Sequence, residues 1–171
     1  ETGSSSSTHF IINTFQTSAD QAQAAEIMRS CPDAVAFVQS LYESGTLPVS
    51  QYMGSAPIDE GDWTEDVVFS KFDISVEPQN QERYADAYAK MMKKISRDVE
   101  MRSYGVGAVG FGRDRFTHWV WTGARSIPEL NEITQRLTSH PVFMEFNQDV
   151  GRMRDVVNTS QNVIIKSYPR Q

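Results

Sequence analysis

Cysteine and histidine are scarce in this chain of 171 residues, which has one cysteine and three histidines. The single thiol, Cys31, excludes an internal disulfide and removes the paired thiolates of a structural zinc site. His9, His118 and His140 show neither HxH nor HExxH spacing, the patterns typical of metal-binding histidines. The sequence therefore predicts no dedicated metal site.

Long apolar runs and clusters of basic residues are also missing. The longest purely apolar run is 34–38, far short of the ~20 residues that a membrane-spanning helix needs. The formal net charge is −6, and the lysines and arginines are scattered along the chain. Because nucleic acids and anionic membranes both select clustered positive charge, we expect neither as a partner. The 39% of hydrophobic residues instead predicts a globular chain.

The first seven residues carry no periodic pattern, and we predict a tag or a disordered lead there. Glu1-Thr2-Gly3 resembles the remnant of a eukaryotic secretion vector. Asn158-Thr159-Ser160 is a glycosylation sequon, so Asn158 is a candidate glycosylation site if the protein is secreted by a eukaryotic host. These two features predict an exported protein. A lone thiol also fits the cytosol, and that alternative stays open.

Residues 66–168 show the pattern of one complete folding unit. Alternating apolar residues predict strands over 66–75, 103–111, 116–124 and 156–168. Helical spacing predicts a helix over 80–97, and a second helix capped by Ser126 and restarted at Pro141. This order predicts an α+β, ferredoxin-like βαββαβ module, with an antiparallel sheet and both helices on one face. An unrelated α+β fold with the same element order is the alternative.

Residues 8–54 predict a strand over 8–17, a helix from Ser18 that breaks at Pro32, and a short strand near 48–54. Residues 55–65 hold a proline, a glycine and several acidic residues, which predicts a linker. An offset of 109 positions lays 8–13 on 117–122 and Pro32 on Pro141. This match predicts that 8–54 is a half-repeat of the module and docks on it as an α/β-barrel-like pseudo-dimer. A chance similarity of amphipathic patterns is the alternative.

The stretch from Tyr104 to Val150, with its Ser-x-Pro-x-Phe-x-x-Phe segment at 139–146, resembles the dimeric α/β-barrel family, which includes antibiotic-biosynthesis-type monooxygenases. More narrowly, the chain is similar to uncharacterised exported bacterial proteins with one and a half or two such modules. The resemblance implies that two modules pair into a barrel, as in a homodimer, often around a ligand pocket. The family includes enzymes acting on quinols, haem or polyketides, some without any cofactor. The matching motifs are structural, so they leave open whether this chain is an enzyme, and the sequence itself requires no cofactor.

His118 is the candidate catalytic residue, as a general base or a haem ligand, because it lies between a hairpin tip and a strand. A histidine that is merely hydrogen-bonded at a strand start is the alternative. Arg113 and Arg115 flank the hairpin tip and could bind a carboxylate, although such residues are more often a solvated turn. Lys71 and Asp73 share a strand face with Phe69 and become functional candidates if that face is buried.

Aromatic residues supply the candidate ligand site. The period of two puts Trp119 and Trp121 on one strand face, which suits a flat aromatic ligand, a sheet-to-sheet interface or plain core packing. Gly105 and Gly107 on the neighbouring strand leave room over one face, for a ligand or for close packing.

Three functions follow from these patterns. One is a small-ligand-binding barrel for an apolar or aromatic molecule, related to cofactor-independent oxygenases, with a pocket between helix and sheet lined by Tyr104, Trp119 and His118. Another is a non-catalytic exported module whose sheet faces are used for packing. A haem- or flavin-binding protein is a third, weaker reading.

Overall fold

The computed structural model describes residues 2–3, 7–112 and 115–168. The chain divides into two compact units, which we treat separately. The helical unit is His9–Val49, and the sheet unit is Ser50–Gln171 together with Glu1–Thr8.

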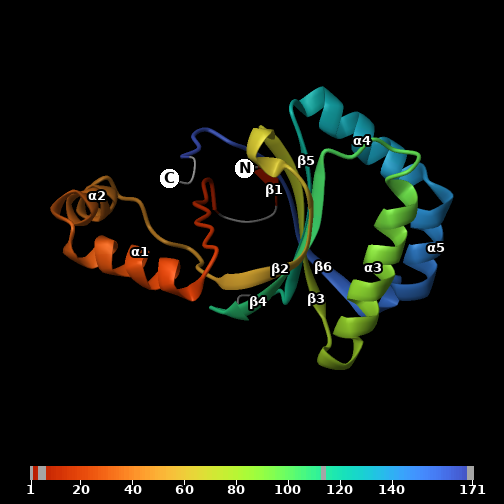
Figure 1. Cartoon of the computed structure of the whole chain (residues 1–171), viewed down its shortest axis with the longest axis horizontal. Coiled ribbons are helices and arrows are strands. Elements are labelled where there is room, and N and C mark those ends of the chain that lie inside the picture. The colour runs from red at the N-terminus through yellow and green to blue at the C-terminus, as the bar shows by residue number, and fades with distance from the viewer. Residues whose placement is uncertain (1, 4–6, 113–114, 169–171) are drawn as a thin grey trace. The chain divides into compact units, whose positions relative to one another are not determined.

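The described strands of the sheet unit form one antiparallel sheet in the order β1-β6-β3-β5-β4-β2 (Figure 1). Within it, the order β6-β3-β5-β4 is that of a ferredoxin-like βαββαβ unit, which confirms the predicted fold of 66–168. The strands are β1 (Thr2–Gly3), β2 (Met53–Gly61), β3 (Val68–Val76), β4 (Ser103–Phe111), β5 (His118–Ala124) and β6 (Arg154–Val163). The helices are α3 (Gln81–Ile95), α4 (Ile127–Ser139) and α5 (Pro141–Val150), with 3₁₀ turns at Trp63–Glu65, Pro78–Asn80 and Gly151–Met153.

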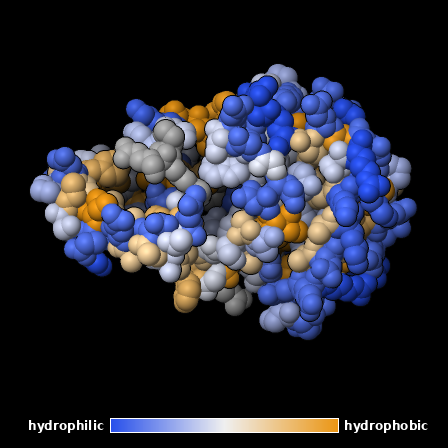
Figure 2. Space-filling view, viewed as in Figure 1, coloured by the Kyte–Doolittle hydropathy of each residue, from blue (hydrophilic) through white to orange (hydrophobic). Residues whose placement is uncertain are grey.

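Helices α3, α4 and α5 cover one face of the sheet, as predicted (Figure 1). Helix α3 buries a stripe of large side chains at helical spacing, which pack on Ile74 and Val106 of the sheet. Each such side chain stabilises the fold by roughly 1.5–3 kcal/mol relative to exposure. The outer surface of these helices is hydrophilic (Figure 2), as an amphipathic layer requires. The stripe comprises Tyr84, Tyr88, Met91, Met92 and Ile95.

Local signals placed α4 and α5 correctly. Ser126 is the N-cap of α4, and its side chain accepts a hydrogen bond from the Glu129 backbone N–H, as predicted. Pro141 opens α5, because proline lacks the N–H that a first turn leaves unpaired.

The predicted linker over 55–65 is wrong, since most of it lies in β2 and a 3₁₀ turn. β2 is an edge strand that pairs with β4 alone, and its ladder slips between Ser55 and Ile58. The slip takes Pro57 out of the regular pairing, so its missing N–H costs the sheet little. Linker-like composition therefore concealed an irregular edge strand.

The helical unit contains α1 (Ser18–Ser30) and α2 (Pro32–Glu43), which confirms the predicted proline-broken helix. The capping box is formed by Thr17 and Asp20, one residue before the predicted Ser18 and Gln21. The predicted strand over 8–17 is wrong, because the structure gives those residues no strand. β-Branched and aromatic residues favour a strand only when a neighbouring strand pairs with it. Without that strand, neither the half-repeat nor the barrel-like pseudo-dimer is shown.

Candidate functional site

The two sheet faces separate the residues expected to share one pocket. In the register of β4 and β5, Gly107 lies opposite Trp119, and Ala108 lies opposite His118. Tyr104 shares its face with His118, the face that α3, α4 and α5 cover, and both tryptophans point to the other one. We call that second face the open face because α3, α4 and α5 do not cover it, although Asp73, Ser160 and Asn162 on it are themselves buried. The predicted single pocket lined by Tyr104, Trp119 and His118 is therefore wrong.

Glycines on β4 let the two tryptophans lie against the sheet. A Cβ at Gly107 would stand 2.0 Å from the Trp119 indole, and one at Gly105 would stand 2.1 Å from that of Trp121. The Trp119 ring also reaches β2, since a Cβ at Gly54 would be 2.8 Å from its Cη2. The space that the glycines leave is thus filled by indole rings. Their outer sides make a flat, half-buried aromatic surface on the open face.

An aromatic cluster extends this surface at one end. The Tyr52 ring packs edge-on against Phe116, with centroids 5.0 Å apart, and lies 5.5 Å from the Trp119 ring. The sequence patterns did not single out Tyr52, because its contact depends on β2 pairing with β4. Phe116 is 6% exposed, and so is a fixed wall of the cluster.

Lys71 and Asp73 form an ion pair beside the aromatic cluster. The Lys71 ammonium lies 5.1 Å from the ring centroid of Phe116 and 5.6 Å from that of Tyr52. The Asp73 side chain is 7% exposed and accepts a second hydrogen bond from the Asn158 Nδ2 at 3.2 Å. Both groups belong to β3 and point to the open face, opposite Trp121 and Trp119 respectively.

β6 adds a polar row to the same face. Ser160 pairs with Lys71, and Asn162 pairs with Phe69. The Asn162 Nδ2 donates to the Ser160 Oγ at 3.0 Å. Within the described residues, the buried Oδ1 of Asn162 has no hydrogen-bond partner. The open face thus runs from an aromatic surface on β5 to an amide and hydroxyl row on β6, with the ion pair between them.

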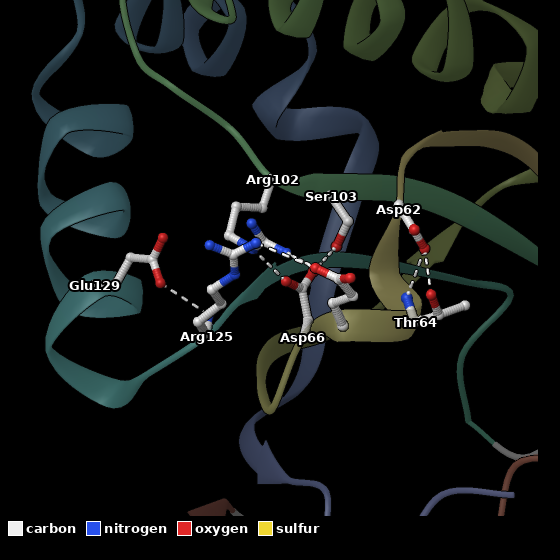
Figure 3. Close-up of polar contacts among 8 residues, drawn as sticks. Asp62, Thr64, Asp66, Arg102, Ser103, Arg125 and Glu129 are labelled. Carbon is white, nitrogen blue, oxygen red and sulfur yellow. Dashed lines mark hydrogen bonds and ion pairs between the residues drawn. The ribbon is translucent and has the colours of Figure 1, made fainter. Parts of the chain in front are cut away.

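A second network of polar side chains links the strands at one end of the sheet (Figure 3). The buried carboxylate of Asp66 accepts hydrogen bonds from the Arg102 Nε at 2.6 Å and from the Ser103 Oγ at 2.5 Å. The bond to Asp66 raises the pKa of the Arg102 guanidinium. Gly123 is required here, because a Cβ would stand 2.3 Å from the Asp66 Oδ2. Both oxygens of Asp66 are bonded, so this carboxylate fastens the strands together.

The same end of the sheet carries two shorter contacts, also drawn in Figure 3. The Asp62 carboxylate caps the 3₁₀ turn at Trp63–Glu65 by accepting from Thr64, and these bonds lower the pKa of Asp62. The Arg125 backbone N–H donates to Glu129 at 2.8 Å and so ties the end of β5 to α4.

His118 lies beside a different, small pocket. Its Nδ1 is 2.8 Å from the Thr117 Oγ1, which also accepts from the Val76 N–H. Burial lowers the pKa of His118, so the imidazole is neutral at pH 7. The pocket has a volume of about 240 Å³ and includes Gln81 and Phe116 in its lining. The histidine is 6% exposed and lies on the helix-covered face, so it is not part of the open face.

The other predicted site residues are dispersed. Tyr104 is half-buried against the main core, and Arg115 is exposed. Arg113 lies outside the described residues. Asn158 is half-buried on β6, and its amide nitrogen bonds Asp73. Glycosylation at Asn158, export and a homodimer all stay predictions.

Over residues 2–3, 7–112 and 115–168, no group of three or more histidine, cysteine, aspartate or glutamate side chains is arranged to hold a metal ion. In the same part of the chain, no helix is long and apolar enough to cross a bilayer.

The sequence and the fold were compared with those of known proteins, and the matches are to solved structures alone. No protein-family model and no curated protein matches the sequence. Solved structures do match at low identity, and they include proteins named as monooxygenase-like or anthrone oxidase-like. At this identity the likeness establishes the fold alone.

Three of these structures illustrate the likeness. A protein of Fusobacterium nucleatum named for a presumed monooxygenase activity has a TM-score of 0.56 at 11% identity; the match covers 84% of this chain but only 64% of that one. An anthrone oxidase-like protein gives 0.55 at 11% identity, with 86% of this chain and 69% of that chain covered. A major regulator of staphylococcal pathogenesis gives 0.52 at 10% identity, covering 70% of this chain and 73% of that one.

Proposed function

We propose that the open face of the sheet binds a planar aromatic small molecule and that the protein is a small-ligand-binding member of this monooxygenase-like fold. The observation that carries the proposal is the pair of indoles packed against the backbone of β4 at Gly105 and Gly107. An indole ring held in place in this way can stack with a flat aromatic ligand. Tyr52 and Phe116 limit the surface at one end, and the Lys71–Asp73 pair supplies polar groups next to it.

The binding part of this proposal is tested with a neutral probe, naphthalene-2-carboxamide. We expect calorimetric titration to show binding to the unmodified protein, weakened at least about fivefold in a Trp119→Ala/Trp121→Ala variant, since two stacking contacts of about 0.5–1.5 kcal/mol each are lost. Tyr168→Ala is the control, because Tyr168 is an aromatic side chain that is 79% exposed and lies beyond the last strand. Equal affinity in the double variant would contradict the proposal.

The finer proposal is a cofactor-independent oxygenation of the bound ligand. Its support is the shared fold with an anthrone oxidase-like protein, together with the two indoles that would hold a flat ring on the open face. His118 is not a general base for a ligand held there, since it lies on the opposite face.

Anthrone is the probe for this activity. Anthrone and one dioxygen give anthraquinone and one water, so oxygen uptake follows the reaction directly. We expect uptake above the buffer rate with the unmodified protein and a loss of that excess in the Trp119→Ala/Trp121→Ala variant, which lacks the surface that would hold the ring. If no uptake occurs while naphthalene-2-carboxamide still binds, the enzymatic part fails and the binding part stands.

A further inference from the structure

The ligand class of the open face can be narrowed from its polar groups. We propose that the ligand carries an anionic oxygen, a carboxylate or a phenolate, on its aromatic ring, and that Lys71 is the residue that selects it. This inference rests on the proposed function, because it assumes that an aromatic molecule lies on the tryptophans.

The first argument is the position of the Lys71 ammonium. It lies on β3 at the pair position of Trp121, with the rings of Phe116 and Tyr52 within 6 Å of the nitrogen. The Lys71 side chain is 20% exposed, so the charge is mostly withdrawn from water yet still reachable. A ring stacked on the tryptophans would bring a substituent at its edge to this nitrogen.

The second argument is the count of hydrogen bonds. The Asp73 carboxylate is bonded on both oxygens, on Oδ1 by Lys71 and on Oδ2 by Asn158. An ammonium has three N–H donors. Among the side chains that the structure describes, Asp73 is the one acceptor bonded to Lys71. Donors of the Lys71 ammonium are therefore left for an anionic oxygen, whereas the remaining lone pairs of Asp73 belong to a side chain that is only 7% exposed.

The third argument is that a positively charged ligand would find no accessible partner beside Lys71. A positively charged ligand would need the Asp73 carboxylate, but this group is 7% exposed and already bonded twice. It would also bring a second positive charge close to Lys71. The net charge of −6 on the whole chain weakly disfavours any anion, but charges beyond about 8 Å are screened at physiological salt.

Three probes that share one ring system test the inference: 2-naphthoate, naphthalene-2-carboxamide and 2-naphthylmethylammonium. We expect the unmodified protein to bind 2-naphthoate about tenfold more tightly than the amide, and the ammonium most weakly. Lys71→Met should weaken 2-naphthoate at least tenfold and leave the amide within twofold. Lys71→Arg should keep the preference for the anion.

The matched control is Lys166→Met. Lys166 also has its ammonium near an aromatic ring, 5.3 Å from the Tyr168 centroid, but it lies beyond the last strand. This variant removes the same charge and should leave all three affinities unchanged.

The outcomes separate this inference from the proposed function. If Lys71→Met keeps the preference for 2-naphthoate, the inference is overturned and aromatic binding stands. If no probe binds the unmodified protein, both are overturned. If Lys71→Met does not fold, because it leaves the buried Asp73 carboxylate without its countercharge, the neutral pair Lys71→Met/Asp73→Asn replaces it. In the unmodified protein, 500 mM NaCl should also weaken 2-naphthoate relative to the amide, and an equal effect on both would count against the inference.

Discussion

At the scale of single residues, the open face depends on a match between small and large side chains on neighbouring strands. Gly107 and Trp119 are paired across β4 and β5, and the indole occupies the volume that any larger residue on β4 would take. The alternation of β5 was enough to predict that Trp119 and Trp121 share a face, since side chains repeat with a period of two. The sequence could not predict whether a ligand or a neighbouring ring fills the space above the glycines of β4, because both would fit there.

The glycine contact gives a stability prediction. Gly107→Ala should lower the free energy of unfolding by about 1–3 kcal/mol, because the new Cβ would stand 2.0 Å from the indole. Gly110→Ala is the control on the same strand, since its Cβ would meet nothing closer than 3.7 Å. Urea denaturation measures both. A Trp119→Ala background should remove most of the cost of Gly107→Ala, and a cost that persists there would show another cause.

His118 gives a prediction about pH. Burial lowers the pKa of His118 in the folded protein, so the unfolded chain binds its proton first as the pH falls. The contribution of His118 to stability is complete above the unfolded value of about 6.5 and is lost as the pH falls from there through the folded pKa, at up to about 1.4 kcal/mol per pH unit. Urea titrations between pH 7.5 and 4.5 should show a shallower fall for His118→Gln than for the unmodified protein. Parallel curves would exclude the histidine as the cause.

At the scale of elements, the helices were more predictable than the first two predicted strands. Capping residues, prolines and an apolar stripe are local signals, and they predicted α2, α3, α4 and α5. A strand is complete only when another strand pairs with it. For this reason the segment 8–17 was predicted as a strand and is not one, whereas β2 was hidden by its proline and acidic residues. Tyr52 was missed as a site residue for the same reason.

The Asp66 network gives a prediction at this scale, because it fastens the start of β3 to the start of β4. Asp66→Ala should cost about 3 kcal/mol of unfolding free energy. It removes a fully buried carboxylate together with the two hydrogen bonds that this group accepts. The ion pair of Arg83 with Asp149 is equally short at 2.6 Å, but both side chains are 59% exposed. Asp149→Ala should therefore cost at most about 1 kcal/mol. Equal losses in a denaturant titration would contradict the structural role of Asp66.

At the scale of the whole molecule, the two units differ in how much they bury. In α1 and α2, all of whose residues the structure describes, none is buried, and Phe37, Tyr42 and Ile27 are each about half exposed or more. The sheet unit, in contrast, has a continuous core built from α3, α5 and the strands. The free energy of local unfolding should therefore be lower for α1 and α2 than for the sheet unit.

Hydrogen exchange followed by mass spectrometry tests this difference in local stability. The amides of α1 and α2 should exchange at least a hundredfold faster than those of α3, because local opening there exposes little apolar surface. Similar protection in all three helices would show that α1 and α2 gain stability from contacts other than those within their own unit.

The pairing of Gly107 with Trp119 also restricts how this sequence can diverge. A lineage can shrink the tryptophan first and then add a side chain to the glycine, but the reverse order passes through a strained intermediate. The same applies to Gly105 and Trp121. Among homologues, a larger residue at either glycine should therefore occur together with a smaller residue opposite it. The aromatic surface of the open face is thus inherited in pairs of positions, and a descendant that loses the tryptophan of a pair is then free to lose the glycine.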